Sequence, residues 1–308
     1  MAVSARHADN PPMNNRLPIN PPISAPSWHA ELQLGFARRD ARSVLRENRH
    51  RGPLRVQKAL YPEGESVCQV ILLHPPSGIA GGDHLHIAAT VDATAHAQIT
   101  TPGAGKWYRS GGAEASQTID FIVAAGGTLE WLPQETIVFD GARARLQTHV
   151  ALAEGSRYLG WEILCLGRSA SGERFTYGSI DLHTRVERAR QEVPLGYAGG
   201  PLWLERGQIA GNDPMLASPA GWAGATVCGT LLATLLPDDD VGALLAACRH
   251  IAPVDGAEHG ISALPGLLVA RYLGVHSEAA RHWFTTLWQA LRPALLGRPA
   301  VPPRIWNT

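Results

Sequence analysis

A run rich in proline and glycine, ending in side chains that bind metal ions, is the part of this sequence with the most evident chemistry. It extends from His74 to Asp83, and the histidines His84 and His86 follow directly. Such a run does not form a helix, and this kind of backbone is used where the main chain comes close to another group. Because Asp83, His84 and His86 are all competent metal ligands, the run indicates an active site, a path for a metal ion, or a tight turn.

The spacing of His84 and His86 places both side chains on one face of a strand, with Asp83 on the other face. A His-x-His pair on a strand supplies two ligands to zinc or nickel. Two histidines that only face solvent have the same spacing. A catalytic metal site needs a third ligand, which the sequence does not identify. A β-rich metalloenzyme that uses His84, His86 and a carboxylate is therefore one hypothesis.

Three further carboxylates lie in strongly apolar surroundings. Glu130 and Glu135 belong to an apolar strand–turn–strand unit, and Glu162 follows Trp161 in an apolar strand. If such a side chain points inward, it needs a partner, because burying an unpaired carboxylate is costly. For Glu130 this partner is Lys106, Arg109 or a passing cation. An outward-facing glutamate is the alternative.

Other chemistries find little support in the motifs. Gly105 and Lys106 resemble part of a phosphate loop, but that motif needs a glycine at Thr100 and a hydroxyl residue at Trp107. The segment is better read as a wide turn with a basic and aromatic rim, which is also typical of interaction surfaces. There is no Gly-x-Ser-x-Gly signature of a serine nucleophile. The motifs thus favour a metal-related role over nucleotide binding or acyl transfer.

The elements that must position these residues are mostly strands. Alternating or apolar runs separated by Gly, Pro and Asp cover residues 30–36, 67–73, 85–91, 95–101, 117–123, 128–132, 136–139, 146–152, 158–166 and 174–182. Two helices are expected after Pro237, at residues 238–251 and, with Ser277 as N-cap, at 278–291. Residues 264–272 fit a strand or a helix, and no repeat of fixed period is visible. The pattern indicates an all-β architecture followed by C-terminal helices, not a doubly wound sheet.

The composition of the chain limits the classes of protein to which it can belong. The chain has 308 residues, 45% of them hydrophobic, and equal numbers of basic and acidic residues, 27 each. This balance gives no electrostatic footprint for nucleic acid or an anionic membrane, and no apolar stretch approaches the roughly 20 residues of a membrane span. Residues 1–27 read as a disordered tail rich in Pro and Asn, and residues 28–308 as a single domain. The widely spaced cysteines, in apolar surroundings, indicate buried thiols: Cys68, Cys165, Cys228 and Cys248. A cytoplasmic protein is expected.

An ordered set of motifs along residues 28–308 resembles the UreD (UreH) family of urease accessory proteins. No single motif is decisive, but the order of the set is specific, and the one departure is Ser77, where the family usually has glycine. The motifs are residues 52–58, the run from His74 to Asp83, residues 101–110, Trp131 to Glu135, Gly160 to Glu162, Leu166 to Arg168, Gly172-Glu173, Gly229 to Leu231, Gly266 to Arg271, Leu291 to Pro293, and Pro303 to Trp306.

The resemblance implies a β-helix-like stack of sheets with two helices in the C-terminal third, and a role that is not enzymatic. The resemblance implies a scaffold that joins UreF and the GTPase UreG and docks the complex on apo-urease. The complex assists the GTP-dependent insertion of nickel, and two copies pair through a UreF dimer. The resemblance thus implies transient Ni²⁺ and no tightly bound cofactor.

With this resemblance, the carboxylates gain a hypothetical role. Nickel that moves through a protein needs weak oxygen or imidazole ligands, because tight thiolate sites would trap it. We expect some of six side chains to line a polar passage: Asp83, Glu130, Glu135, Glu162, His84 and His86. The alternative for each acid is that it only bonds the amides of glycine loops. The aromatic residues of the last helix, Trp283, Phe284 and Trp288, are expected to pack in the core or in part to contact UreF.

Overall fold

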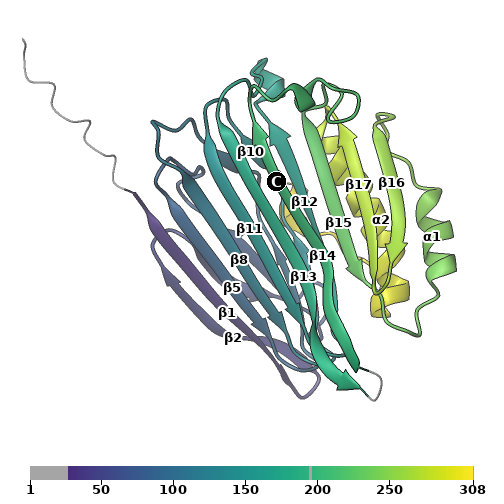
Figure 1. Ribbon diagram of the computed structural model, residues 1–308. Helices are drawn as coiled ribbons and strands as arrows, with labels where there is room; N and C mark the ends of the chain where they lie inside the picture. The colour runs from purple at the N-terminus through teal and green to yellow at the C-terminus, as the bar shows by residue number, and fades with distance from the viewer. Residues whose placement is uncertain (1–26, 194–195, 308) are drawn as a thin grey trace, which may run out of the picture.

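The computed structural model describes residues 27–193 and 196–307, which form two stacked β-sheets and a layer of helices (Figure 1). The seven-stranded sheet has the order β14 (Gly196–Ala210), β13 (Ser179–Val193), β11 (Arg143–Leu152), β8 (Ala115–Val123), β5 (His84–Val91), β1 (His29–Arg39) and β2 (Arg42–Arg51). The ten-stranded sheet has the path β16 (Glu258–Leu264), β17 (Leu267–Gly274), β15 (Val227–Thr234), β12 (Arg157–Leu166), β9 (Thr128–Leu132), β6 (His96–Thr100), β4 (Cys68–Leu73) and β3 (Arg55–Leu60), with β10 (Thr136–Val138) and β7 (Gly105–Trp107) beside it. The helices are α1 (Val241–Arg249) and α2 (Ser277–Leu296).

The chain winds between the two sheets as a β-solenoid of about four turns. Strands β5, β8, β11 and β13 are parallel neighbours in one sheet, and β4, β6, β9 and β12 are parallel neighbours in the other. Equivalent positions in successive turns are occupied by His84, Ser116, Arg145 and Asp181, so the interval varies between 29 and 36 residues. This variation explains why no fixed period is visible in the sequence. The expected β-helix-like stack with two C-terminal helices is confirmed.

The two ends of the solenoid differ. At one end, three short turns are closed by hydrogen bonds from the amides of Ala95, Gly127 and Ser156 to carbonyls three residues earlier. The residue before each of these has a positive φ: Thr94 at 58°, Gly126 at 66° and Gly155 at 64°. At the other end, longer loops such as residues 74–83 and 108–114 join the strands. Because connecting loops carry most binding residues in proteins, this second end is where a functional site is expected.

Thr94 is the strained member of this set of turns. A β-branched residue is a genuine outlier at positive φ, whereas glycine adopts this conformation at no steric cost. We expect Thr94→Gly to raise the free energy of unfolding by about 1 kcal/mol. Ala93→Gly, one residue earlier, serves as the control and should lower it, because it adds only conformational freedom to the unfolded chain. Urea unfolding measures both, and a destabilised Thr94→Gly variant would contradict the strain.

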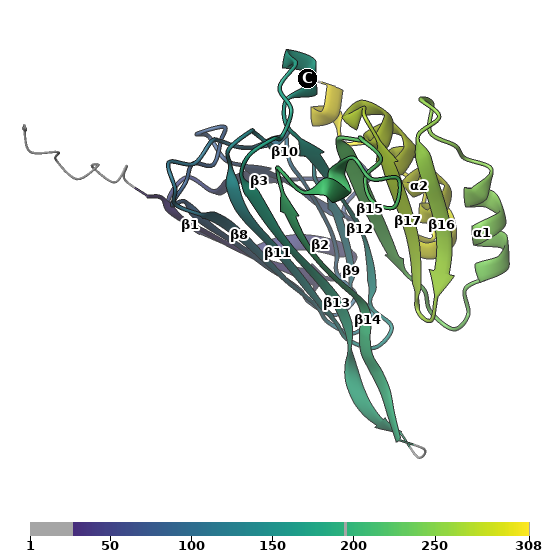
Figure 2. The same cartoon turned by 45° about the horizontal axis from the view of Figure 1, so that its top comes forward.

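Two hydrophobic cores hold the three layers together. The larger core lies between the two sheets, and the second lies between the ten-stranded sheet and α2 (Figure 2). In the second core, Trp283, Phe284, Leu287 and Trp288 are all at most 1% exposed. The expectation that these aromatic side chains pack in the core is therefore confirmed: they pack against the sheet, with Trp161 and Trp306 close by.

Several element boundaries differ from those expected from the sequence. Helix α1 begins after Asp240, whose side chain accepts a hydrogen bond from the Ala243 amide, so the aspartates precede the helix. Helix α2 begins at Ser277 itself and continues through Pro293 to Leu296, so Ser277 is not its N-cap. Residues 264–272 comprise the end of β16, the turn at Pro265 and Gly266, and strand β17 from Leu267 onward, which together form a hairpin. The charged strand β2 was missed because an edge strand needs no apolar alternation.

The cysteines and the N-terminal segment were also the subject of predictions from the sequence. The four cysteines are free, three are buried and Cys228 is half-buried, and burial raises the pKa of each thiol. The buried-thiol prediction is confirmed for the other three. The predicted tail lies almost entirely outside the described residues, and the single-domain assignment stays a prediction. Within the part of the chain that is described, no helix is long and apolar enough to cross a lipid bilayer.

Candidate functional site

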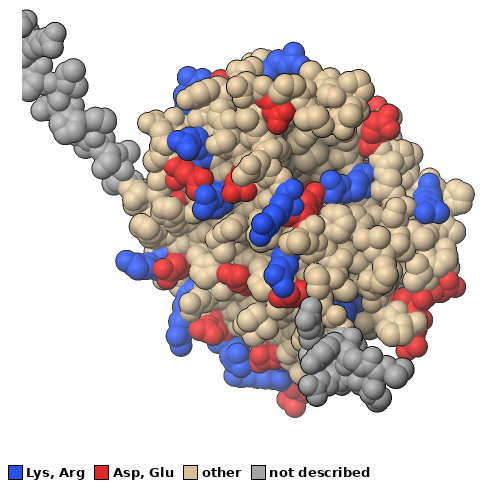
Figure 3. All heavy atoms as spheres, in the orientation of Figure 1, with Lys and Arg blue, Asp and Glu red and all other residues tan. Residues whose placement is uncertain are grey.

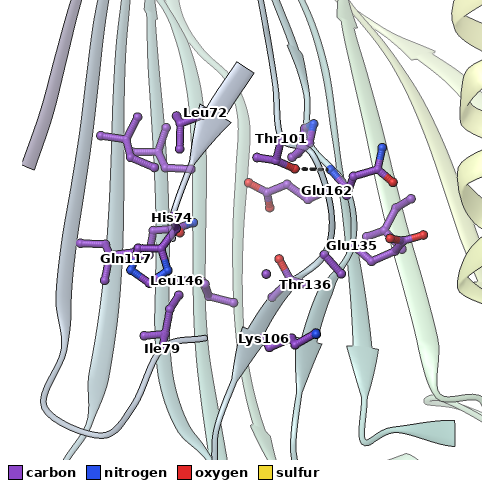
Figure 4. Close-up of a pocket in the computed structure, with 18 of the residues that line it drawn as sticks. Leu72, His74, Ile79, Thr101, Lys106, Gln117, Glu135, Thr136, Leu146 and Glu162 are labelled. Atoms are coloured by element: carbon purple, nitrogen blue, oxygen red, sulfur yellow. Dashed lines mark hydrogen bonds between the residues drawn. The ribbon is translucent and has the colours of Figure 1, made fainter. Parts of the chain in front are cut away.

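A cavity of about 360 Å³ lies between the two sheets, toward the end of the solenoid that carries the long loops. Its floor is apolar, with Leu85, Ile87 and Ile119 from the seven-stranded sheet. Its polar lining comes from both sheets and from the loops, with Gln117, Gln147 and Thr148 on the seven-stranded sheet. In Figure 4, Gln117 and Leu146 lie on one side of the hollow, opposite Thr101 and Glu162. A space of this size holds on the order of ten waters, so a hydrated ion fits inside it.

Glu162 on β12 is the carboxylate that points into this cavity (Figure 4). The hydroxyl of Thr148 donates to its Oε1 at 2.6 Å, and the hydroxyl of Thr184 donates to its Oε2 at 3.2 Å. Desolvation raises the pKa of Glu162, and the nearby Glu205 carboxylate adds to this effect, while the two threonines oppose it. Glu162 is thus a carboxyl group that holds a proton more readily than usual, in contact with a hollow.

Glu135 also lines the cavity, but Figure 4 shows its carboxylate turned away from Glu162. It forms an ion pair with Arg281 on α2, with 3.4 Å between Oε1 and Nη1. The same guanidinium donates to Gln134 Oε1 at 2.6 Å. Glu135 therefore lies where the cavity wall meets the helical layer, and it is partly neutralised by an arginine.

Two basic side chains also belong to the lining, His74 and Lys106. Desolvation lowers the pKa of His74, although the Asp83 carboxylate opposes this shift. His74 is therefore predominantly neutral at pH 7, and a neutral imidazole is a metal ligand. The lining thus offers carboxyl and imidazole groups that are spread over the cavity wall.

Glu130 faces the other side of the ten-stranded sheet and belongs to a buried ionic network with α2. It is 0% exposed, as is Arg292. The Arg292 Nη2 lies 3.0 Å from Glu130 Oε1, and His96 Nε2 and Trp288 Nε1 bond the same carboxylate at 2.7 and 2.6 Å. Burial alone would raise the pKa of Glu130, but His96 and Arg292 outweigh it and hold the pKa at about 2. Glu130 does need a partner, as expected, but the partner is neither Lys106 nor Arg109.

Asp83 is occupied by backbone amides. Its Oδ1 accepts from the Trp28 amide at 2.9 Å and its Oδ2 from the Ala80 amide at 2.8 Å. The carboxylate therefore fixes the path of the glycine loop next to β1. Asp83 therefore agrees with the alternative to a metal-binding role, in which an acid only bonds the backbone amides of a glycine loop.

His84 and His86 lie on the outer face of the seven-stranded sheet, and neither lines the cavity. His84 Nδ1 is 2.7 Å from the Ser116 hydroxyl, and its ring stacks on His29 with 5.0 Å between centroids. His86 Nε2 is 2.8 Å from Asp120 Oδ2. The predicted placement on one face is consistent with the strand geometry, and His86 does meet a carboxylate.

The six candidate side chains thus occupy four separate places. Glu162 and Glu135 share the cavity wall, while Glu130, Asp83 and the histidine pair lie elsewhere. Among the described residues, no group of three or more His, Cys, Asp or Glu side chains is placed to hold a metal ion. The sequence interpretation missed Thr148, Thr184, His74 and Arg292. The two threonines face each other across β11 and β13 in the register, a relation that only the fold reveals.

Comparisons with known proteins give matches over almost the whole chain. A model of the family described as UreD urease accessory protein matches residues 29–307. The chain is 68% identical to a urease accessory protein UreD of Dechloromonas aromatica, over 96% of this chain and 100% of that protein. It is 54% identical to the UreD of Pseudomonas fluorescens Pf-5 and 50% identical to that of an Azoarcus species, in each case over at least 92% of both chains. From this coverage and identity, the chain belongs to the UreD family of urease accessory proteins, which are not enzymes.

Proposed function

We propose that this protein is a scaffold of the urease maturation complex, in which it joins UreF and UreG and docks on apo-urease. In this role it assists the GTP-dependent insertion of nickel, and the cavity between its sheets is part of the route of the ion. Two copies assemble with a UreF dimer into a heterotetramer. The ion is cargo, held for a short time, and the protein has no resident cofactor.

The observation that carries this proposal is the Glu162 carboxyl group inside a hollow of about 360 Å³. A transported divalent cation needs ligands that bind weakly and one at a time, since a complete set would retain it. Oxygen ligands suit this requirement better than thiolates, which bind such ions tightly. The lining supplies dispersed oxygen and imidazole groups, and Cys165 and Cys228 do not line it.

A metalloenzyme built on His84 and His86 is the weaker hypothesis. Both side chains are on the outer face of the sheet, partnered by Ser116 and Asp120 rather than by the cavity residues. Glu130 and Asp83, two of the acids that would complete such a site, bond Arg292 and backbone amides instead. The proposal therefore assigns the outer histidines no role in nickel transfer.

The test is carried out in cells that contain the urease genes and lack the gene for this protein. We expect urease to remain inactive without the protein and to regain activity when it is supplied. The tagged protein should co-purify with UreF. Normal urease activity in the deletion strain, or no capture of UreF by the wild-type chain, would contradict the scaffold role.

A further inference from the structure

Basic side chains are concentrated at one lateral end of the solenoid, where β2 and β3 are the last strands of their sheets. Residues 38–58 contain eight basic and two acidic side chains, a formal charge of +6 in a chain whose net charge is zero. All eight are exposed, and we call them the basic edge: Arg38, Arg39, Arg42, Arg46, Arg49, Arg51, Arg55 and Lys58. Figure 3 shows Lys and Arg side chains projecting at the lower left of the molecule, with Asp and Glu side chains between them, where Figure 1 places β1 and β2.

Only part of this charge is neutralised within the molecule. Three arginines have ion pairs: Arg42 with Glu65, Arg46 with Asp92, and Arg49 with Glu47, at 3.4, 2.9 and 3.2 Å. The other five have no ion pair with any residue that the structure describes: Arg38, Arg39, Arg51, Arg55 and Lys58. Arg51 is opposite Glu31 in the β1–β2 register, without an ion pair. An excess of exposed cations therefore remains on this surface.

Protection of the sheet edge explains some of these charges. Charged residues on an edge strand prevent it from pairing with another chain. The basic edge also includes Arg38 and Arg39 at the end of β1, however, which is an inner strand, and it spans the edge strands of both sheets, β2 and β3. Like charges this close repel one another in the free protein. A surface of this kind gains most when opposite charges cover it.

We propose that the basic edge is a docking surface for a protein partner that presents a carboxylate-rich surface. Nucleic acid fits less well, since single strands need exposed aromatic rings for stacking, and no large hydrophobic side chain within residues 38–58 is exposed. A lipid surface also fits less well, since stable membrane binding combines a basic cluster with inserted apolar side chains, and none is exposed within these residues. The first 26 residues carry two arginines and a single aspartate, so this segment is not a complementary occupant.

The test compares two variants with the same change in charge, and its choice of probes rests on the proposed function. Arg51→Glu with Arg55→Glu reverses the basic edge. Arg174→Glu with Arg304→Glu is the control, because both of these arginines are exposed and lie outside the edge. Binding to purified UreF, UreG and apo-urease is measured at low and high salt. We expect the edge variant to lose about tenfold or more in affinity for one of these proteins, the control to lose little, and the wild-type complex to weaken with salt.

The lysines provide an independent readout, because Lys58 in the basic edge and Lys106 at the cavity are the only two in the sequence. A carbodiimide joins a lysine amine directly to a carboxylate in contact with it. We expect a cross-link from Lys58 to an Asp or Glu of the bound partner. Lys58→Arg should abolish this cross-link without weakening binding.

Each result is decisive for one of the two proposals. If the edge variant binds every probe as tightly as the control does, or if cross-links form only at Lys106, the basic edge is not the docking surface. Tight, salt-sensitive binding of a labelled DNA duplex that competes with the protein partner would also overturn it. If the wild-type chain binds none of the probes, the scaffold role itself fails.

Discussion

Replacing Arg292 by methionine is expected to lower the free energy of unfolding by about 3–5 kcal/mol, the typical cost of leaving a buried charge without its partner. Arg292 is 0% exposed and contacts both Glu130 and Glu63. Without it, two glutamates that are almost completely buried lose their main cation. Because small domains are stable by only about 5–15 kcal/mol, this single change is a large part of the total. Urea unfolding followed by tryptophan fluorescence measures the difference.

Arg281→Met is the matched control on the same helix. Arg281 is 30% exposed and pairs with Glu135 at 3.4 Å, so its loss should cost about 1 kcal/mol or less. The double variant Arg292→Met with Glu130→Gln should recover part of the loss, since it removes one of the unpaired charges. Equal stability of the Arg292→Met and Arg281→Met variants would contradict the buried network.

Acid titration provides a second readout for the same network. The pKa of Glu130 is about 2 in the folded protein, against an ordinary value of 4.5. A depressed pKa contributes stability that is complete above pH 4.5 and is lost as the pH falls toward 2. The difference in unfolding free energy between the wild type and Glu130→Gln should therefore shrink between pH 4.5 and pH 2. A constant difference over this range would show that Glu130 is not held in its ionised form.

Replacing Glu162 by alanine is expected to lower urease activation in cells by about tenfold or more, while the protein still captures UreF. The carboxyl group is the acid that points into the cavity, where a cation would meet it. Burial and the Glu205 carboxylate raise the pKa of Glu162, and a cation in the cavity would favour its ionised form. Urease activity per unit of assembled complex measures the effect.

Glu162→Gln separates the two roles that Glu162 can have. Glutamine keeps one oxygen that accepts from one of the two threonines, and its amide nitrogen can donate to the hydroxyl of the other, but it cannot balance the charge of a cation. If Glu162 serves the ion, Glu162→Gln should be as defective as Glu162→Ala. Thr148→Val is the control, since it removes one hydrogen bond and leaves the carboxyl group in place. Full activation by Glu162→Gln would reduce Glu162 to a structural role.

Most strands of this fold could be predicted from the sequence pattern, whereas the winding of the chain into a solenoid could not. Period-two alternation predicted most strands of the solenoid, because each buries one face against a neighbouring layer. The winding itself was implied only by the family resemblance, since turns of unequal length hide the repeat. Even so, Thr94, Gly126 and Gly155 are separated by the same numbers of residues as the equivalent positions His84, Ser116 and Arg145 of the strands. The short turns therefore mark the repeat in the sequence, which the alternation within each strand does not.

For the candidate site, the sequence could predict which acids were unusual but not what each one contacts. Glu130 and Glu162 both stand out as carboxylates in apolar strands, yet one bonds a helix and the other faces a cavity. The difference is set by Arg292, which lies 162 residues after Glu130, and by Thr148 and Thr184 on other strands. Contacts over such separations depend on sheet order and on which face a strand presents. One sequence does not contain this information.

The solenoid also limits how the hollow between its sheets can change in size. Each winding adds one strand to either wall, and neighbouring strands are about 4.8 Å apart. A related protein that needed a longer or shorter channel would therefore gain or lose whole windings, in increments of about that distance. Removing one complete winding, including its short turn, would shorten the channel by about the distance between two neighbouring strands. The remaining strands would keep their register.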